Sequence, residues 1–237
     1  MLRSILNIQV KASNYIDKDI KMSELNSQKE EYLITIYKLM SEGEKVTNKS
    51  ISTHLDLAPS SVTEMLKKLK EQGLVKDSKE NILTDEGRQI TKKILSKHRL
   101  WEYFLEKELE FSWKDIHPIA SDLQSVTNDE LLEKLNAYLG YPDYCPHGSI
   151  IFINNEETPD DFIKMSEAKT GKAYIIRRIR DDHDLLSYCE NMEIGIGDKI
   201  KFLAYDKFDN TAIIIENDKE KRISPKACKD IYLKEID

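Results

Sequence analysis

The chain has few cysteines and no long apolar run. Its 237 residues include three cysteines, an odd number at wide spacing, which excludes a disulfide scaffold and favours a reducing compartment. No stretch approaches the roughly 20 apolar residues that span a bilayer, and no small-residue cleavage site follows the apolar patch at residues 5–10. We therefore expect a cytoplasmic protein with no membrane partner. Residues 1–24 are expected to form an N-terminal extension, in which Met22 is an alternative start.

Signatures of catalysis are scarce as well. The chain has no Gly-rich phosphate loop and no zincin motif. Cys145 and His147 together suggest a thiol nucleophile, but no further His or Asn constellation is tied to them. We predict that the protein is not an enzyme. Inertness of Cys145 towards a mild alkylating agent at neutral pH would remove the remaining support for a thiol nucleophile.

The segment from Thr47 to Val75 predicts two short helices around a tight turn. Pro59 interrupts the first pattern, and a second helix begins near Ser60. Gly73 closes this second helix, whose apolar residues recur at spacings of three and four, namely Val62, Met65, Leu66 and Leu69. Residues 74–84 then predict a β-hairpin. The pattern is typical of a winged helix-turn-helix DNA-binding domain, which we place at residues 25–86, although other small helical domains can share it.

The outer face of the second helix carries small hydroxyls near its start and lysines farther along. Such hydroxyls can approach bases and phosphates closely, and the lysines can neutralise backbone charge. We predict that Ser60, Ser61 and Glu64 face base edges. Glu64 only accepts hydrogen bonds, so a cytosine amino group is its natural partner. The predicted phosphate contacts are Thr47, Asn48, Lys49, Lys67, Lys68 and Lys76.

The charge distribution is compatible with a nucleic-acid partner, although the net charge is −7. Residues 1–98 hold 17 Lys and Arg against 14 Asp and Glu, whereas residues 99–237 hold 19 against 29. Phosphate contacts act within a Debye length of about 8–10 Å, so a locally basic face is sufficient. The asymmetry favours DNA binding by residues 1–98.

Amphipathic helical patterns surround the winged segment. Ser27 and Glu30 predict a capping box for a helix that continues to Met40. Further helices are predicted at residues 84–108, 113–123 and 128–139. So many apolar helical faces indicate a dimer interface as well as a core, and we place a helical dimerisation and metal-binding domain at residues 87–141.

The composition changes at Tyr141. Residues 142–161 are rich in Pro, Gly and Asn and predict a linker. A short helix fits residues 185–191, and short β segments alternate with turns at residues 173–179, 199–205, 211–216, 220–224 and 231–233. The predicted fold class is therefore mainly α with a small β-barrel, the barrel being an SH3-like domain at residues 162–237. Cys189 and Cys228 are expected in its core.

The order of winged helix, long helix, helical pair, Cys-Pro-His-Gly segment and small β-barrel resembles the diphtheria toxin repressor family. The likeness is greatest to its streptococcal and staphylococcal branch of manganese- and iron-sensing repressors. It covers roughly Lys29–Ile236 and is carried by TNKSIS, PSSVTEMLKKLKEQGLV, LTDEGR, KHRLWEYFL and LGYPDYCPHG. The resemblance implies a C-terminal domain of the FeoA type. It also implies a homodimeric repressor that binds a palindromic operator when a divalent cation occupies each subunit, and so controls metal-uptake genes.

The resemblance further implies an ancillary metal site formed by His98, Glu102, His117 and Asp181. Two imidazoles with two carboxylates suit Mn²⁺ or Fe²⁺, and also Zn²⁺. Without the resemblance, a His and a Glu four residues apart would equally suit a solvated helix pair.

The primary site of the family does not match. Its ligand positions on the helix after His117 read Ser121, Gln124 and Ser125, which are weak ligands for a divalent ion. Glu31 and Cys145 still match an acidic ligand and a thiol, but those two alone could not hold a metal tightly. We expect this site to be absent or rebuilt, with one retained metal site per subunit. His147 and His183 are expected to be solvated.

Two other interpretations stay open. The chain could be a DNA-binding regulator of the same fold whose metal control has been lost or replaced by another signal, with Ser121, Gln124 and Ser125 as a replacement effector site. Alternatively, the SH3-like domain could grip a peptide, although its aromatic residues fall mostly at strand positions that indicate core.

Overall fold

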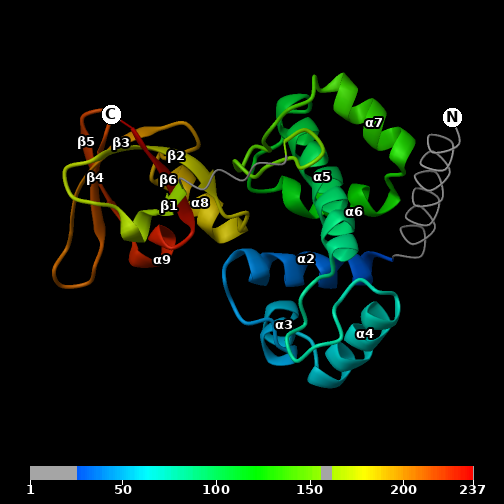
Figure 1. Ribbon diagram of the computed structural model, residues 1–237. Coiled ribbons are helices and arrows are strands. Elements are labelled where there is room, and N and C mark those ends of the chain that lie inside the picture. Colours follow the sequence, from blue (N-terminus) through cyan, green and yellow to red (C-terminus); the bar gives the residue numbers. More distant parts are fainter. Residues whose placement is uncertain (1–25, 156–161, 237) are drawn as a thin grey trace, which may run out of the picture. The chain divides into compact units, whose positions relative to one another are not determined.

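The computed structural model describes residues 26–155 and 162–236 (Figure 1). The predicted N-terminal extension and residues 156–161 of the predicted linker lie outside this range. The chain divides into two compact units, and their boundary falls between Leu95 and Ser96. Within the described ranges, no helix combines the length and the apolar character that crossing a bilayer requires.

The described part of the first unit holds three short helices and a wing ahead of α5 (Asp85–Lys107). They are α2 (Ser27–Ser41), α3 (Asn48–Leu55) and α4 (Pro59–Glu71), and in the wing Val75 pairs with Leu83. The predicted inner face of α4 is buried as a whole, and it joins a core that includes Tyr32, Leu33, Ile36, Leu39, Ile51 and Leu74. The predicted winged helix-turn-helix is confirmed.

One predicted helix cap is wrong. The N-cap of α2 is Asn26, whose Oδ1 accepts a hydrogen bond from the Lys29 N–H at 2.9 Å. The expected capping box of Ser27 and Glu30 does not form, because asparagine one residue earlier is an equally good cap. Gly73, at φ +72°, follows the end of α4 as expected.

The second unit begins within α5 (Asp85–Lys107) and continues with α6 (Ile116–Val126) and α7 (Asp129–Tyr138). Asn128 caps α7 as predicted, since its Oδ1 accepts from the Leu131 N–H at 2.9 Å. The helix α6 begins three residues later than the pattern indicated, because residues 112–115 form a separate turn. Apolar residues of the three helices form two buried clusters. One contains Leu100, Leu132 and Leu135, and the other contains Leu105, Ile116 and Ala120.

The segment 142–155 is folded against the helices. Tyr144 pairs with Ile150 in an isolated bridge, and Phe152 is buried. Arg99 of α5 donates a hydrogen bond to the Ile150 carbonyl, and its guanidinium lies 5.0 Å from the centroid of the Phe152 ring. The Pro- and Gly-rich composition that indicated a linker thus marks a packed, turn-rich segment.

The C-terminal part is a six-stranded antiparallel sheet in the order β1-β6-β2-β3-β4-β5. Its strands are β1 (Phe162–Lys164), β2 (Ala173–Ile179), β3 (Lys199–Tyr205), β4 (Ala212–Glu216), β5 (Lys219–Ile223) and β6 (Ile231–Ile236). The helices in this part are η1 (Met165–Glu167), α8 (His183–Asn191) and α9 (Pro225–Cys228). Cys189 and Cys228 lie in the core as expected, together with Tyr174, Ile176, Phe202 and Ile214.

The sheet is open, which corrects the predicted closed barrel. Among the described residues β1 and β5 are the two edges, and closure would require them to pair. The strand β1 has only three residues, and β5 exposes Lys219, Glu220 and Arg222, as suits an edge strand. The sequence missed β1 because three residues carry too little pattern.

Candidate metal centre and DNA-binding face

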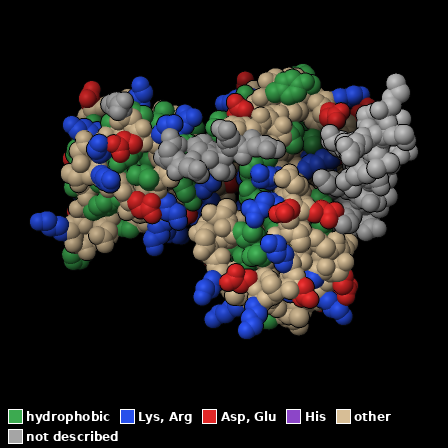
Figure 2. Space-filling model, in the orientation of Figure 1, with side chains coloured by type: hydrophobic (Ala, Val, Ile, Leu, Met, Phe, Trp, Pro, Cys, Tyr) green, Lys and Arg blue, Asp and Glu red, His purple; other side chains and the backbone are tan. Residues whose placement is uncertain are grey.

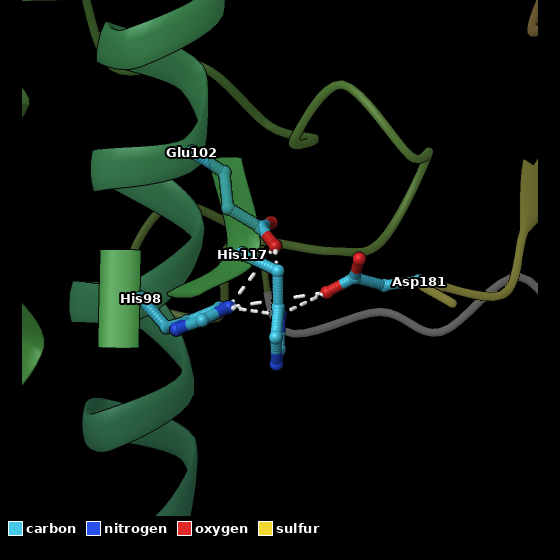
Figure 3. A group of neighbouring side chains, drawn as sticks. All are labelled: His98, Glu102, His117 and Asp181. Atoms are coloured by element: carbon cyan, nitrogen blue, oxygen red, sulfur yellow. Dashed lines mark hydrogen bonds and ion pairs between the residues drawn. The ribbon is translucent and has the colours of Figure 1, made fainter. Parts of the chain in front are cut away.

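Four predicted ligands meet in the second unit, although they come from three segments of the chain. His98 and Glu102 lie one turn apart on α5, where the helix places them on one face. His117 belongs to the first turn of α6, and Asp181 lies just beyond the end of β2. Their side chains point towards a common centre (Figure 3).

The donor atoms of these four residues are close enough to share one ion. The His98 Nε2 lies 3.0 Å from the Glu102 Oε1 and 3.0 Å from the His117 Nδ1. The His117 Nδ1 also contacts the Asp181 carboxylate. All four ligand atoms lie within 4.8 Å of one another. Ligands about 2.1 Å from a Zn²⁺ at tetrahedral angles would be about 3.4 Å apart, so the spacing fits a first-row divalent cation.

Glu102 is the central acidic group of this centre. Its side chain is only 2% exposed, and burial by itself disfavours the carboxylate. The charge of His98 and hydrogen bonds from His117, His147 and His98 outweigh that burial and hold the pKa of Glu102 well below its usual range. Glu102 is therefore ionised at neutral pH, as a metal ligand must be.

The acidic neighbours of His117 give the metal-free centre a defined pH dependence. Burial lowers the pKa of His117, but hydrogen bonds to Asp181 and Glu102 and their charges prevail and raise it to about 9. Because the folded-state pKa exceeds the ordinary value of 6.5, protonation stabilises the metal-free fold. That stabilisation is complete below about pH 6.5 and is lost as the pH rises towards 9.

Cation binding is expected to strengthen over the same pH interval. The proton on the His117 Nδ1 must leave before this nitrogen can ligate, so affinity should rise about tenfold per pH unit for each proton released. Isothermal titration with Zn²⁺ at pH 6.5, 7.5 and 8.5, in two buffers of different ionisation enthalpy, measures both affinity and proton release. An affinity that does not change with pH would contradict this prediction.

A second group of potential ligands shares Glu102. It consists of Glu102, Cys145 and His147, all three of them buried. The His147 Nδ1 lies 3.5 Å from the Glu102 Oε1 and 4.0 Å from the Cys145 Sγ. The expectation that His147 is solvated is wrong, because its side chain is 0% exposed. Its spacing of two residues from Cys145 is the signal that could have indicated a joint ligand pair.

The donor chemistry of the second group also fits a divalent cation. Burial and the negative charge of Glu102 raise the pKa of the Cys145 thiol, against hydrogen bonding and charge from His147. Since a thiolate is the ligating form, binding there would release a proton. A thiolate, an imidazole and a carboxylate form a mixed set that accommodates Zn²⁺ and its first-row neighbours.

Four further ligand candidates came from the family's primary site. Ser121 and Ser125 are exposed on α6, and Gln124 is buried there. Glu31 is exposed on α2. Glu31 belongs to neither group of potential ligands found among the described residues.

The predicted DNA-contacting residues lie on exposed parts of the first unit. Ser60, Ser61 and Glu64 are exposed along α4. Thr47 caps α3 through its Oγ1, which accepts from the Ser50 N–H at 3.0 Å. The lysines at positions 49, 67, 68 and 76 are all exposed. Figure 2 shows basic side chains projecting from the part of the molecule formed by α2, α3 and α4, with acidic ones between them.

Glu64 carries a local ion pair on this face. Its Oε1 accepts from the Lys68 Nζ at 2.8 Å, one helical turn along α4. The hydrogen bond and charge of Lys68 lower the pKa of Glu64. The pair keeps Glu64 ionised, and therefore an acceptor, on the exposed side of the helix.

Asn48 is engaged in hydrogen bonds within the protein. Its Nδ2 donates to the Thr63 Oγ1 at 3.0 Å, and its Oδ1 accepts from the Asn81 Nδ2 at 2.9 Å. Asn81 is buried, and its backbone N–H donates to the Val46 carbonyl at 3.0 Å. These bonds connect α3, α4 and the base of the wing.

A winged helix-turn-helix together with a centre of imidazole and carboxylate ligands defines the class of metal-dependent DNA-binding regulators. Three family descriptions match consecutive parts of the chain. They are the iron dependent repressor N-terminal DNA binding domain at residues 24–82, the iron dependent repressor metal binding and dimerisation domain at residues 84–153, and the FeoA domain at residues 163–235. The chain belongs to the iron-dependent repressor family, which includes the diphtheria toxin repressors, and to its manganese- and iron-responsive branch.

Individual relatives agree with this assignment. The iron-dependent repressor IdeR of Mycobacterium tuberculosis is 26% identical over 182 residues, which are 70% of this chain and 79% of the relative. A crystal structure of ScaR with bound Zn²⁺ is 34% identical with a TM-score of 0.78, covering 88% of this chain and 99% of that chain. A manganese-dependent transcriptional repressor in complex with manganese is 27% identical with a TM-score of 0.80, covering 87% and 99%. These relatives are transcriptional regulators and not enzymes.

Proposed function

We propose that this protein is a homodimeric, cytoplasmic repressor that binds a palindromic operator, responds to Mn²⁺ or Fe²⁺, and controls metal-uptake genes. The observation that carries the proposal is the convergence of His98, Glu102, His117 and Asp181 on one centre in a chain that also has a winged helix-turn-helix. The assignment of the FeoA-type domain as SH3-like belongs to the same proposal.

The two ligand groups revise the expected stoichiometry. Glu102 belongs to both groups, and its Oε1 faces both His98 and His147, so one carboxylate could bridge two ions. We propose up to two divalent cations per subunit, one with His98, His117 and Asp181 and one with Cys145 and His147. The loss of ligands at Ser121, Gln124 and Ser125 is thereby compensated by a set that the chain retains.

The chain's own residues suggest how binding is transmitted. When bound, a divalent cation supplies positive charge that holds the two carboxylates and the imidazoles together. His98 and Glu102 fix one end of that connection on α5, and Asp181 fixes the other beyond β2. Because α5 also provides Ile90 and Ile94 to the core of the first unit, the same helix takes part in both units. Its constraint would restrict the recognition helices to the separation that an operator requires.

Metal titration combined with operator binding tests this function. Isothermal titration with Mn²⁺ is expected to give two ions per subunit, and gel shifts with a promoter fragment of metal-uptake genes should show binding that is lost in chelator. Operator affinity that is unchanged by chelator would instead favour the alternative, a regulator of the same fold without metal control. Absence of salt-sensitive affinity for DNA, with and without metal, would overturn the proposal.

Salt dependence can separate phosphate contacts from positioning residues on the DNA-binding face. Lys49→Ala should lower the slope of log affinity against log salt by about 0.9, because one phosphate contact is lost. Asn48→Ala should weaken binding about fivefold through the loss of its bonds to Thr63 and Asn81, with an unchanged slope. Fluorescence anisotropy with operator DNA at several salt concentrations measures both variants. An equal change of slope would show that Asn48 contacts phosphate after all.

A further inference from the structure

The carboxylate of Glu190, on α8, contacts three consecutive residues of the turn before α6. Its Oε1 accepts from the Trp113 Nε1 at 2.8 Å and from the Ser112 Oγ at 3.2 Å. Its Oε2 accepts from the Lys114 Nζ at 2.6 Å. A single side chain of the C-terminal part therefore fixes a turn that lies 76 to 78 positions away in the sequence. No local sequence pattern indicates this contact.

Trp113 connects this turn to the second ligand group. Its indole ring lies stacked near the His147 ring, with centroids 5.9 Å apart and an interplanar angle of 25°. Its backbone carbonyl lies 2.8 Å from the His147 Nε2. Trp113 also packs against the apolar core of the C-terminal sheet. The residue thus contacts α8 through its indole N–H and His147 through its carbonyl.

The bond to the Trp113 carbonyl determines which nitrogen of His147 can ligate. A carbonyl oxygen only accepts, so the His147 Nε2 must carry the hydrogen of this bond. The Nδ1 is then the nitrogen that can offer a lone pair, and it is the one that faces Glu102 and Cys145. Hydrogen bonding of the distal ring nitrogen is the usual way in which a protein orients a ligating histidine.

We propose that Glu190, acting through Trp113, is a positioning residue for His147 and thereby makes cation affinity at the Glu102, Cys145 and His147 group depend on the docking of α8. This inference rests on the proposed metal function. A second contact supports the docking, since the His183 Nε2 of α8 lies 3.4 Å from the Asp115 Oδ1 at the end of the same turn. Cation affinity at this group would therefore depend on the position of α8, although α8 supplies none of its ligands.

Zinc affinity of Glu190 variants of the full chain tests the inference. Glu190→Ala is expected to lower Zn²⁺ affinity at the second group about 10- to 100-fold, the range found for residues that orient a ligand. Glu190→Gln keeps an acceptor oxygen for the Trp113 indole and should stay within about threefold of the wild type. Lys114→Ala, which leaves the bond between Trp113 and Glu190 in place, serves as the matched control and should behave like Glu190→Gln.

Nuclear magnetic resonance of ¹⁵N-labelled histidine gives a measurement that would not change if Glu190 only stabilised the fold. In the zinc-loaded wild type, the His147 Nε2–H should be protected from exchange with water, and its Nδ1 should show the shift of a metal-bound nitrogen. In Glu190→Ala that N–H should exchange at least about tenfold faster, while the ring N–H of His98 stays unchanged as an internal reference.

Cys145→Ala distinguishes failure of the inference from failure of the proposed function. If Cys145→Ala loses one zinc ion while Glu190→Ala retains wild-type affinity and exchange, the second group stands and the role of Glu190 is overturned. If Cys145→Ala retains every ion with unchanged affinity, the second group itself is wrong, and the inference is overturned with it.

Discussion

Replacing Glu102 with glutamine is expected to weaken cation binding at least about 100-fold at both ligand groups, because the same carboxylate belongs to each. Glutamine preserves the size of the side chain but removes the negative charge that His98, His117 and His147 face. The pKa of His117 should fall in the same variant, because Glu102 is one of the two groups that raise it. Isothermal titration with Mn²⁺ and Zn²⁺ measures the affinities, and gel shifts should show loss of metal-dependent operator binding.

Glu130→Gln is the matched control for this substitution. Glu130 pairs with Lys134 at 2.7 Å on the exposed face of α7, where both side chains are more than 70% exposed. The same chemical change there should leave cation affinity unaltered, since exposed pairs contribute little. If Glu102→Gln lost a single ion and kept the other at full affinity, Glu102 would belong to one group only.

The second large effect is expected at Gly148. Its φ of +78° is a conformation that residues with a side chain rarely adopt, and a Cβ there would overlap the backbone carbonyl of Arg177 in β2. The Ile179 N–H also donates to the His147 carbonyl at 3.0 Å, so this turn lies directly against the strand. Gly148→Ala should lower the free energy of unfolding by about 3 kcal/mol or more, and it should weaken cation binding at the Cys145 and His147 pair.

Gly171→Ala serves as a control that separates the free-energy cost of a positive φ from the cost of the steric overlap at Gly148. Gly171 has a similar φ of +82°, but a Cβ there would meet nothing within 4 Å. Its substitution should cost only about 1–2 kcal/mol. Urea unfolding of both variants gives the comparison. Equal losses would mean that the turn yields to the added methyl group and that the close approach to Arg177 is not a constraint.

The winged helix-turn-helix could be predicted because its information is local. Val62, Met65, Leu66 and Leu69 repeat at helical spacing, and they are buried as that spacing requires. Pro59 and Gly73 mark the limits of α4 through their own backbone preferences. Asn48 is the exception, since its bonds to Thr63 and Asn81 join residues 15 and 33 positions away.

The candidate metal centre was predictable only in part. His98 and Glu102 share one helix face at a spacing that the sequence displays, whereas His117 and Asp181 were reached through the family resemblance. His147 was misjudged as solvated, because burial depends on how the turn at residues 145–148 packs and not on its own composition. The predicted barrel was wrong for a similar reason. The strand β1 is too short to be detected from its sequence, and closure depends on pairing between edge strands that no local pattern describes.

The sequence by itself determined the helices, most strands and the residues that present an exposed basic face, because these follow from side-chain periodicity and backbone preference over a few neighbouring positions. Only the tertiary structure decided that Glu102 lies between two ligand groups, that His147 is buried, and that Glu190 reaches Trp113. Those relations join residues tens of positions apart, and they arise from packing that no local stretch of the chain specifies.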